Sequence, residues 1–476
     1  MKIAFVHYNI GHRDGVNTVM RTNALSFLKR YKNSKIYFVG SIVRPLITNQ
    51  KTRVNYIDIP EMDILGKKKK ANLASKQIFD YLKKGMEIYS EIKKKLKNMD
   101  YIILENPNLG VHPPATYAYY RLVKHIHHSH AKQKVIYRIH DFAEDRRGNF
   151  INMLRFKGTE SSPYWHKVMF PRARNTGFVA INKNDLLRLD SHGIIQENRA
   201  HYIPNPVNDH LSYDDNKSKG LRKKLIKEND LDKDVKFIFY PARIVPRKNV
   251  EEAIFLTQLL NIKFDEKYVL VASLKPKGGE GLKYYNRLNK FVKKHNLPVI
   301  LGINDLVTME RQYTNSGKIK MYGIGDMYDI CDKAISTSTM EGFGLFFIES
   351  WFFEKAIIGR DLPEITSDFK TSGINLEHLY NALFIDGSDF KNYGNLSKRL
   401  KLVLRLKNAK FFERFEEENK QTFAGLYDPI NTAAEKKLIK ENRKIVLKEY
   451  CTAAVTKQFM DVLRKIPSEL EVKEKK

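Results

Sequence analysis

Short runs of β-branched and aromatic residues alternate with helical patterns along most of this chain. Apolar residues recur at helical spacing directly after Gly15 and again over 70–98, so a helix is predicted at each place. Strands that alternate with helices form parallel sheets covered on both faces, and the pattern therefore predicts an α/β protein. In the first half, strands are predicted at Lys2–Tyr8, Ile36–Val39, Val54–Ile59, Tyr101–Leu104, Val135–Ile139 and Gly177–Ile181.

The alternation is interrupted at Ile203–Val207, where two prolines precede the polar stretch 212–234. We interpret this stretch as a linker or domain edge. We expect one Rossmann-like domain over 1–208, a second over 209–425 and a charged helical extension over 426–476. Two such domains would face each other across a cleft at the carboxyl ends of both sheets, where ligands bind in such folds. The second half has predicted strands at Val235–Tyr240, Tyr268–Ala272, Pro298–Leu301, Lys333–Ser336 and Ala356–Gly359, and predicted helices at 249–261, 281–296, 345–354 and 393–424.

The composition narrows the class of protein. Hydrophobic residues make up 42% of the 476 residues, which excludes a disordered chain. The two cysteines exclude a disulfide framework and a Cys-rich zinc site, and they fit a reducing compartment. Apolar runs stay below the ~18 residues of a membrane span, and the opening Lys2–Tyr8 is too short for a signal peptide. A soluble, cytoplasmic protein is therefore expected.

The charge is strongly positive, with 84 Lys and Arg against 54 Asp and Glu, a net +30. Such a surface attracts polyanions, although lysine-rich solvated helix faces would give the same sum. The sequence lacks an RNA-binding aromatic signature, a zinc finger and a basic zipper, so no specific nucleic-acid partner is expected. The basic helix 70–98, preceded by Lys67–Lys70, is either a solvated lysine face or a peripheral contact with anionic lipid at the inner membrane face.

A glycine-containing turn and an unusual carboxylate mark the segment from Ser338 to Phe353. A strand is predicted to end near Ser336 and a helix to start near Leu345. Free amides at a helix start, beside glycines that permit close approach, bind phosphate. Glu349 lies in a helix that is apolar nearly all round, so this helix is expected to be buried. A buried carboxylate needs hydrogen-bond donors, which a ribose diol or a buried Arg or Lys would supply.

This segment, Glu341-Gly-Phe-Gly-Leu-x3-Glu349, resembles the Glu-x7-Glu motif of retaining glycosyltransferases with the GT-B fold, in particular glycosyltransferase family 4. Four more segments resemble the family's motifs in the family's order: Gly11-His-Arg-Asp-Gly15-Val, Arg138-Ile-His140-Asp141, Tyr202-Ile-Pro-Asn-Pro-Val207 and Phe239-Tyr-Pro-Ala-Arg243-Ile-Val-Pro-Arg-Lys248-Asn. The resemblance covers residues 1 to about 365. The chain departs from the family's Gly-Gly-x-x-Glu loop at Gly359–Glu364, and Ala242 and Asn249 stand where glycine is usual.

The resemblance implies a metal-independent, retaining hexosyltransferase that uses a UDP- or GDP-linked sugar and no further cofactor. Arg243 and Lys248 would stabilise the leaving diphosphate. By resemblance, Glu349 holds the ribose, Glu341 lies by the sugar hydroxyls and His140 lies near the anomeric carbon. The implied catalytic residues are His140, Glu341, Arg243 and Lys248. The implied donor-binding residues are Gly15, Arg243, Lys248, Glu341, Gly342, Phe343, Gly344, Leu345 and Glu349.

The acceptor would bind mainly to the N-terminal domain, as a small solute, a glycan or a lipid-linked sugar. The candidate acceptor-side residues are Asn106, His112, Asp141 and Arg146. The pair Arg146 and Arg147 favours an anionic acceptor, but an ordinary salt-bridged loop would have the same sequence. Taken without the resemblance, His140 is equally a structural histidine. A hypothesis of another class is a catalytically inactive GT-B-like protein that binds polyanions or a membrane surface.

Overall fold

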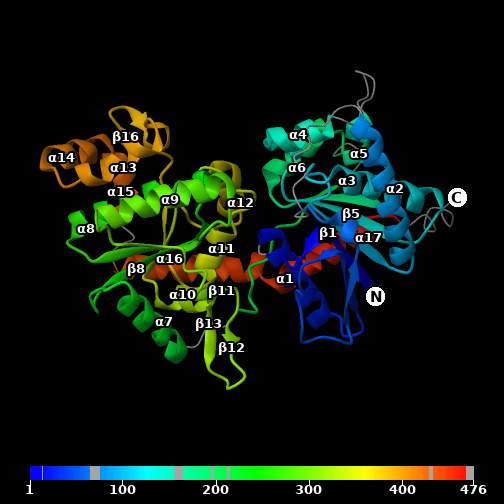
Figure 1. The fold of residues 1–476 in the computed structure, drawn as a ribbon, viewed down its shortest axis with the longest axis horizontal. Coiled ribbons are helices and arrows are strands. Elements are labelled where there is room, and N and C mark those ends of the chain that lie inside the picture. The colour runs from blue at the N-terminus through cyan, green and yellow to red at the C-terminus, as the bar shows by residue number, and fades with distance from the viewer. Residues whose placement is uncertain are drawn as a thin grey trace. The chain divides into compact units, whose positions relative to one another are not determined.

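The protein folds into two compact units (Figure 1). Unit 1 comprises Met1–Asn208 and Tyr450–Lys476, and unit 2 comprises Asp209–Glu449. Unit 1 first ends at the residue where the predicted first domain ends, whereas the predicted extension 426–476 is divided between the two units. The structure is a computed structural model, and it describes residues 1–12, 14–64, 76–154, 164–194, 198–211, 215–427 and 432–467.

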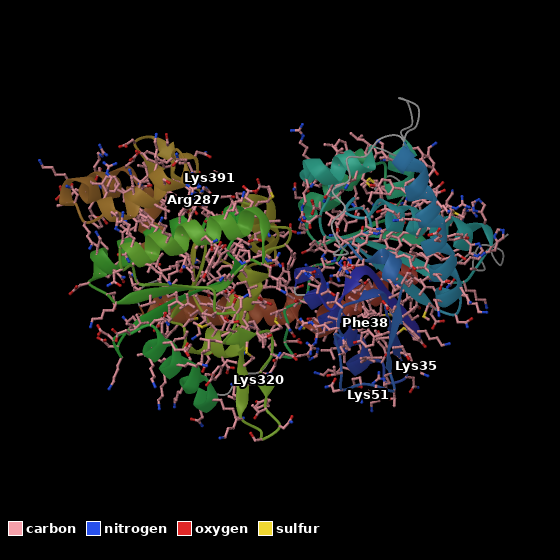
Figure 2. All side chains as sticks on the ribbon, in the orientation of Figure 1. Lys35, Phe38, Lys51, Arg287, Lys320 and Lys391 are labelled. Carbon is pink, nitrogen blue, oxygen red and sulfur yellow. The ribbon has the colours of Figure 1, made fainter. Side chains whose placement is uncertain are left out.

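The excess positive charge is carried by exposed side chains of both units. Lys35 and Lys51 of unit 1 and Lys320 and Lys391 of unit 2 are exposed, whereas Phe38 is buried (Figure 2). In the described parts of the chain, no helix is both long enough and apolar enough to cross a bilayer.

The sheet of unit 1 has seven strands in the order β3-β2-β1-β4-β5-β6-β7, and all neighbours are parallel. The six predicted strands are confirmed, with ends that differ by a few residues. The sequence pattern does not reveal the short β7, because Ala-His-Tyr has no β-branched run. The strands are β1 (Lys2–Ile10), β2 (Lys35–Ile42), β3 (Val54–Asp58), β4 (Tyr101–Glu105), β5 (Lys134–Ile139), β6 (Thr176–Ala180) and β7 (Ala200–Tyr202).

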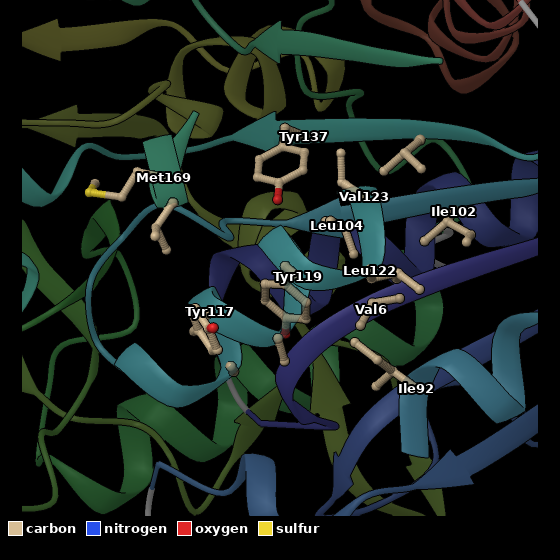
Figure 3. Close-up of a cluster of buried hydrophobic side chains, with 14 of the residues drawn as sticks. Val6, Ile92, Ile102, Leu104, Tyr117, Tyr119, Leu122, Val123, Tyr137 and Met169 are labelled. Atoms are coloured by element: carbon tan, nitrogen blue, oxygen red, sulfur yellow. The ribbon is translucent and has the colours of Figure 1, made fainter. Parts of the chain in front are cut away.

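Helices cover both faces of this sheet because successive strand residues point to opposite sides. Val6 of β1 faces a core shared with α2 and α3, part of which Figure 3 shows. Phe5, the preceding residue, faces a second core shared with α1 and α17. The helices of unit 1 are α1 (Gly15–Arg30), α2 (Lys76–Leu96), α3 (Pro113–His128), α4 (Arg147–Met153), α5 (Tyr164–Met169), α6 (Lys183–Ser191) and α17 (Thr452–Lys465).

The main sheet of unit 2 has five parallel strands in the order β10-β9-β8-β14-β15. All five predicted strands are confirmed. They are β8 (Lys236–Arg243), β9 (Tyr268–Leu274), β10 (Val299–Leu301), β14 (Lys333–Ser336) and β15 (Ile357–Gly359). Two small sheets complete the unit, one of β11 (Val307–Thr308), β12 (Gln312–Tyr313) and β13 (Ile319–Gly323), the other of β16 (Phe384–Ile385) and β17 (Ser388–Asp389).

The helices of unit 2 correct two predictions. Of the two alternatives for 212–234, a linker or a domain edge, the linker is wrong, since α7 occupies much of the stretch and Leu221 and Leu225 are buried one turn apart. The boundary between the two units lies directly before it, at Asn208 and Asp209. The single helix predicted over 393–424 is three helices, with breaks at Asn408 and Asn419. The Asn408 side chain caps the second helix, accepting a hydrogen bond from the backbone of Phe411. The helices are α7 (Asp215–Glu228), α8 (Val250–Phe264), α9 (Gly279–Lys294), α10 (Ile324–Ile330), α11 (Leu345–Phe352), α12 (Pro363–Thr371), α13 (Leu396–Arg405), α14 (Ala409–Glu418), α15 (Lys420–Tyr427) and α16 (Thr432–Ile445).

The chain returns to unit 1 through a π-helical turn, Val446–Tyr450, and ends there in α17. Ser26 of α1 donates a hydrogen bond to the Thr452 carbonyl at 3.0 Å and accepts one from Thr456 at 2.6 Å. These buried contacts attach α17 to α1. The last helix is therefore a structural part of unit 1.

Candidate active site

In unit 2 the strand order reverses between β8 and β14, and the loops that follow these two strands are joined there. The backbone N–H of Thr339 donates to the carbonyl of Arg247 at 2.9 Å. The Thr337 hydroxyl donates to the carbonyl of Asn249, also at 2.9 Å. In sheets of this type, ligands bind outside the carboxyl ends of the strands at such a reversal. Apart from Gly15, which lies in unit 1, the predicted donor-site residues lie at the end of β8, on these two loops and on α11.

The charged groups of Lys248 and Glu341 are in direct contact, and each side chain is 13% exposed. Arg247 Nη1 lies 3.4 Å from the other Glu341 oxygen. Burial opposes ionisation of Glu341, but the two cations outweigh it and hold the pKa of this carboxyl below its usual value. Burial lowers the pKa of Lys248, and the Arg243 charge is among the neighbours that lower it further. Arg243 and Lys248 thus share one electrostatic neighbourhood.

Glu349 lies on the second turn of α11, between the buried side chains of Ile348 and Trp351. Its carboxylate makes no hydrogen bond or ion pair with any residue that the structure describes. Burial raises the pKa of Glu349 to about 7. The alternative of a buried Arg or Lys partner is therefore not found in the described residues, and the carboxylate is available to hydroxyl donors.

The turn into α11 requires glycine at Gly344. This residue has φ +80°, and a Cβ there would lie 2.8 Å from the Phe347 ring and 3.1 Å from Ile365. Gly342 and Phe343 precede it in the turn, and Leu345 is the first helical residue. The Phe343 ring packs against Phe369 with centroids 5.5 Å apart. The turn is thereby fixed against α12.

Asn249, which stands where glycine is usual in the resembling family, has φ +48°. Asparagine tolerates this left-handed conformation better than other non-glycine residues. Its side chain donates a hydrogen bond to Glu252 at 2.7 Å. Arg360 donates two hydrogen bonds, of 2.7 and 2.8 Å, to the same buried carboxylate. Arg360, from the segment that departs from the family pattern, thus supports the loop after β8, a role that no sequence signal indicated.

In unit 1 the strand order reverses between β1 and β4. Gly15 is the first residue of α1, is exposed, and has open space where a Cβ would stand. Gly11 is the residue whose backbone demands glycine, since it has φ +85° and a Cβ would lie 2.0 Å from the Arg44 carbonyl oxygen. The absence of a side chain at Gly15 therefore keeps the surface open at the helix start.

His140 follows β5, and its Nε2 lies 2.6 Å from a carboxylate oxygen of Glu105, the last residue of β4. Both side chains are buried, at 6% and 0% exposed. The other Glu105 oxygen is 3.5 Å from the guanidinium of Arg138. His140 is one of the predicted site residues, whereas Glu105 and Arg138 are not, although a charged residue at the end of an apolar strand is a signal for both.

The candidate acceptor-side residues lie on neighbouring loops and make structural contacts. Asn106, with φ 55°, accepts a hydrogen bond from the backbone of Asp141 at 3.3 Å. Arg146 pairs with the Asp141 carboxylate at 3.1 Å and is 53% exposed, as in the salt-bridged-loop alternative. His112 caps α3 by accepting a hydrogen bond from Ala115, and burial lowers its pKa to about 4. His112 is therefore a neutral helix cap.

Among the residues that the structure describes, no group of three or more His, Cys, Asp and Glu side chains is placed to hold a metal ion.

Several known proteins are similar to this chain, although no known family profile matches it. A mannosylglucosyl-3-phosphoglycerate synthase of Petrotoga mobilis is 28% identical over 378 residues, which are 76% of this chain and 65% of that protein. The match thus spans less than two thirds of that relative's length.

Solved structures resemble the whole chain at low sequence identity. Sucrose-phosphate synthase of Thermosynechococcus elongatus has a TM-score of 0.57 at 13% identity, over 98% of both chains. A glycosyltransferase of Rickettsia africae has a TM-score of 0.56 at 14% identity, also over 98% of both. The catalytic domain of starch synthase IV of Arabidopsis thaliana has a TM-score of 0.57 at 11% identity, over 98% of both. The predicted fold class is confirmed: the chain has the α/β GT-B fold of these glycosyltransferases.

Proposed function

We propose that this chain is a retaining glycosyltransferase of family 4, which transfers a hexose from a nucleotide-diphosphate sugar to an acceptor hydroxyl without a metal ion. One observation carries the proposal. Glu349, half-buried in α11, has no partner among the described residues. The loop before α11 carries Glu341, which contacts Lys248, and the charge of Arg243 acts on the same lysine. A nucleotide diphosphate has the complementary groups, namely a ribose diol and two phosphates.

The diphosphate would bind at the cations of the loop after β8. Arg243 binds a phosphate through two parallel hydrogen bonds, and Lys248 adds a point charge. The first amides of α11 and the dipole of that helix favour negative charge at the same end. Preorganised donors of this kind contribute about 3–4 kcal/mol each to a transition state in comparable sites.

Glu341 would have two roles in this arrangement. In the free protein it neutralises Lys248 and so limits the repulsion among the clustered cations. With the donor bound, the phosphate shares Lys248, and a Glu341 oxygen becomes available to a sugar hydroxyl. The ion pair thus keeps the buried lysine charged before the substrate arrives.

In the proposed transfer, the bond from the anomeric carbon to the diphosphate oxygen breaks as the acceptor oxygen attacks from the same face. The departing phosphate oxygen takes the proton of the acceptor hydroxyl. The configuration at the anomeric carbon is retained, and no protein nucleophile is needed. His140 lies near the anomeric carbon in this mechanism and interacts with the positive charge that develops there.

We propose a small phosphorylated hydroxy acid as the acceptor class. The Petrotoga relative is named for a product that contains phosphoglycerate. The net charge of +30 and the exposed Arg146 and Arg147 of unit 1 favour an anionic acceptor. Gly15 is kept as a donor-phosphate residue in this proposal, because it stands at the exposed start of α1.

The test is a thermal-shift series with UDP-, GDP- and ADP-hexoses, followed by product analysis with each stabilising donor. Binding at a hundredfold excess over the dissociation constant adds about 2.7 kcal/mol of stability. Phosphoglycerate-type acceptors are compared with their unphosphorylated counterparts, with and without EDTA, and the anomeric configuration of the product is read by NMR. If no nucleotide diphosphate stabilises the protein, the proposal fails.

A second candidate function, contact with an anionic membrane, has one observation in its favour. Lys93, Lys94 and Lys95 form an exposed basic end of α2. The apolar residues Ile88 and Ile92 of the same helix are buried in the core, so the contact would be electrostatic and not insertion. The start of the predicted basic helix, 70–75, lies outside the described residues. Pelleting with anionic vesicles at low and high salt tests this candidate, since electrostatic adsorption fades with salt.

A further inference from the structure

Three charged or titratable residues form a buried group at the carboxyl ends of β4 and β5. Glu105 and Arg138 are direct neighbours in the parallel register of these strands, and His140 lies two residues beyond Arg138. The side chains of Glu105 and Arg138 are 0% exposed, and that of His140 is 6% exposed. Burying charges is costly, and well-packed apolar residues often serve stability equally well. A contribution to stability is therefore a weak explanation for the presence of these three residues at a buried position.

The hydrogen bond between Glu105 and His140 defines which ring nitrogen carries the proton. Burial opposes ionisation of Glu105, but Arg138 and His140 outweigh it and hold the pKa of the carboxyl below its usual value. An ionised carboxylate only accepts hydrogen bonds, so the Nε2 atom of His140, at 2.6 Å, must donate. In the neutral ring, Nδ1 then carries the lone pair. Within the described part of the chain, Nδ1 has no hydrogen-bond partner.

Two further contacts fix the orientation of the Arg138 side chain, and the orientation of the Glu105 carboxylate that it faces is thereby fixed as well. Its Nη2 donates to the Asn205 side chain at 2.8 Å. The Phe459 ring of α17 lies 4.8 Å from its guanidinium carbon. A guanidinium only donates hydrogen bonds, so one oxygen of the residue at position 105 must always face Arg138.

We propose that Glu105 is a positioning residue, which holds His140 in the Nε2–H tautomer so that Nδ1 is the hydrogen-bond acceptor presented to a substrate hydroxyl. Arg138 orients Glu105, and Phe459 of the C-terminal helix orients Arg138. The inference rests on the proposed function for its catalytic consequence. Its structural half, the tautomer of His140, is independent of any activity.

The sharpest test is Glu105→Gln, which preserves shape and replaces one acceptor oxygen by a donor. Because Arg138 can only donate, the oxygen of the new amide must face Arg138, and its NH2 group must then face His140. The ring can satisfy that donor only by accepting at Nε2 and moving its proton to Nδ1. The measurement is the ¹⁵N chemical shifts of the His140 ring near pH 8.5, assigned by comparison with His140→Gln. We expect them to show Nε2–H in the wild type and Nδ1–H in Glu105→Gln.

With a donor and acceptor identified as above, kcat of Glu105→Gln is expected to fall on the order of 10²-fold or more while the donor-induced thermal shift is kept. Glu105→Asp, whose shorter carboxylate still opposes Arg138 but withdraws from His140, is expected to lose the single tautomer and to lower kcat as well. The matched control is Asp326→Asn, a buried carboxylate of unit 2 that pairs with Arg311. It is expected to lower stability and to leave both kcat and the His140 shifts unchanged.

The outcomes separate the two proposals. A wild-type ring with Nδ1–H, or an unchanged tautomer in Glu105→Gln, overturns the inference whether or not the protein is active. A flipped tautomer with unchanged kcat also overturns it, because His140 would then be structural. If Glu105→Gln fails to fold, the wild-type tautomer and Glu105→Asp decide. Absence of transfer in the wild type together with the expected tautomers contradicts the proposed function and leaves the assignment of Glu105 to His140 supported.

Discussion

Lys248 and Glu341 are 93 positions apart in the sequence, yet their charged groups are in direct contact. The contact joins the loop after β8 to the loop after β14, the two neighbouring strands at which the order of the sheet reverses. The contact keeps the positive charge of Lys248 next to the Glu341 carboxylate, and a bound phosphate can compete with this carboxylate for the lysine.

Lys248→Ala is expected to abolish the thermal shift produced by a nucleotide-sugar donor and to lower kcat/KM on the order of 10²–10³-fold. The reason is that the variant removes a cation from the diphosphate position. The control is Lys267→Ala, since Lys267 is 57% exposed and pairs with Asp232 on the surface of the same unit. A donor shift that survives in Lys248→Ala would remove this lysine from the site.

Glu349→Gln is expected to weaken donor binding and, at the same time, to change how the free energy of unfolding depends on pH. The pKa of Glu349 is raised from 4.5 to about 7, so the folded protein binds more protons than the unfolded chain between these values. The free energy of unfolding therefore loses a contribution as the pH rises from about 4.5 to about 7, and the loss is complete above that range.

The neutral amide introduced by Glu349→Gln does not titrate, so the variant lacks this loss. The variant is expected to be more stable than the wild type at about pH 8, on the order of 2 kcal/mol, and equal to it near pH 4. It should at the same time lose most of the donor-induced shift. Urea denaturation at both pH values measures the first effect. Lower stability of the variant at pH 8 would mean that Glu349 has a structural partner.

Arg360→Ala is expected to lower the free energy of unfolding by about 3–5 kcal/mol, because it leaves the buried Glu252 carboxylate without its cation. Glu252 and Arg360 are 0% and 2% exposed. Arg464→Ala, which removes an exposed partner of Asp461, is the control and should change stability by less than about 1 kcal/mol. Equal effects of the two substitutions in urea denaturation would show that the buried pair contributes no more than a surface pair.

The two glycines of the first loop are expected to respond differently to alanine. Gly11→Ala should destabilise unit 1 by about 2 kcal/mol or more, because the methyl group meets the Arg44 carbonyl and φ is positive. Gly15→Ala enters open space and should leave stability nearly unchanged. If the diphosphate approaches this helix start, Gly15→Ala weakens the donor-induced shift without affecting the melting temperature of the free protein. An unchanged donor shift would exclude Gly15 from the donor site.

The fold is predictable from the sequence because local patterns carry it. Runs such as Lys2–Tyr8 and Tyr268–Ala272 lie in parallel sheets that are covered on both faces, so they are apolar along most of their length and stand out from the amphipathic helices between them. The loop residues Arg243, Lys248 and Glu341 can be named because the resemblance covers short motifs at strand ends. Helix α7 and the breaks at Asn408 and Asn419 escape prediction, since a short apolar stripe and a side-chain cap are weak local signals.

The sequence does not reveal which charged side chains are in contact in the folded protein. Glu105 ends β4, whereas Arg138 and His140 lie at the end of β5, and their contact depends on the order and register of these two strands. The path of the last helix back to unit 1, which brings Phe459 to Arg138, depends on packing between segments more than 300 positions apart, as does the contact of Ser26 with Thr456, 430 positions apart. Local propensity and hydrophobic period are properties of neighbouring residues, and they specify strands, helices and turns. The pairing of buried charges depends on the tertiary structure. Two charges attract each other strongly in the low-dielectric interior, but only after the fold has brought them close together.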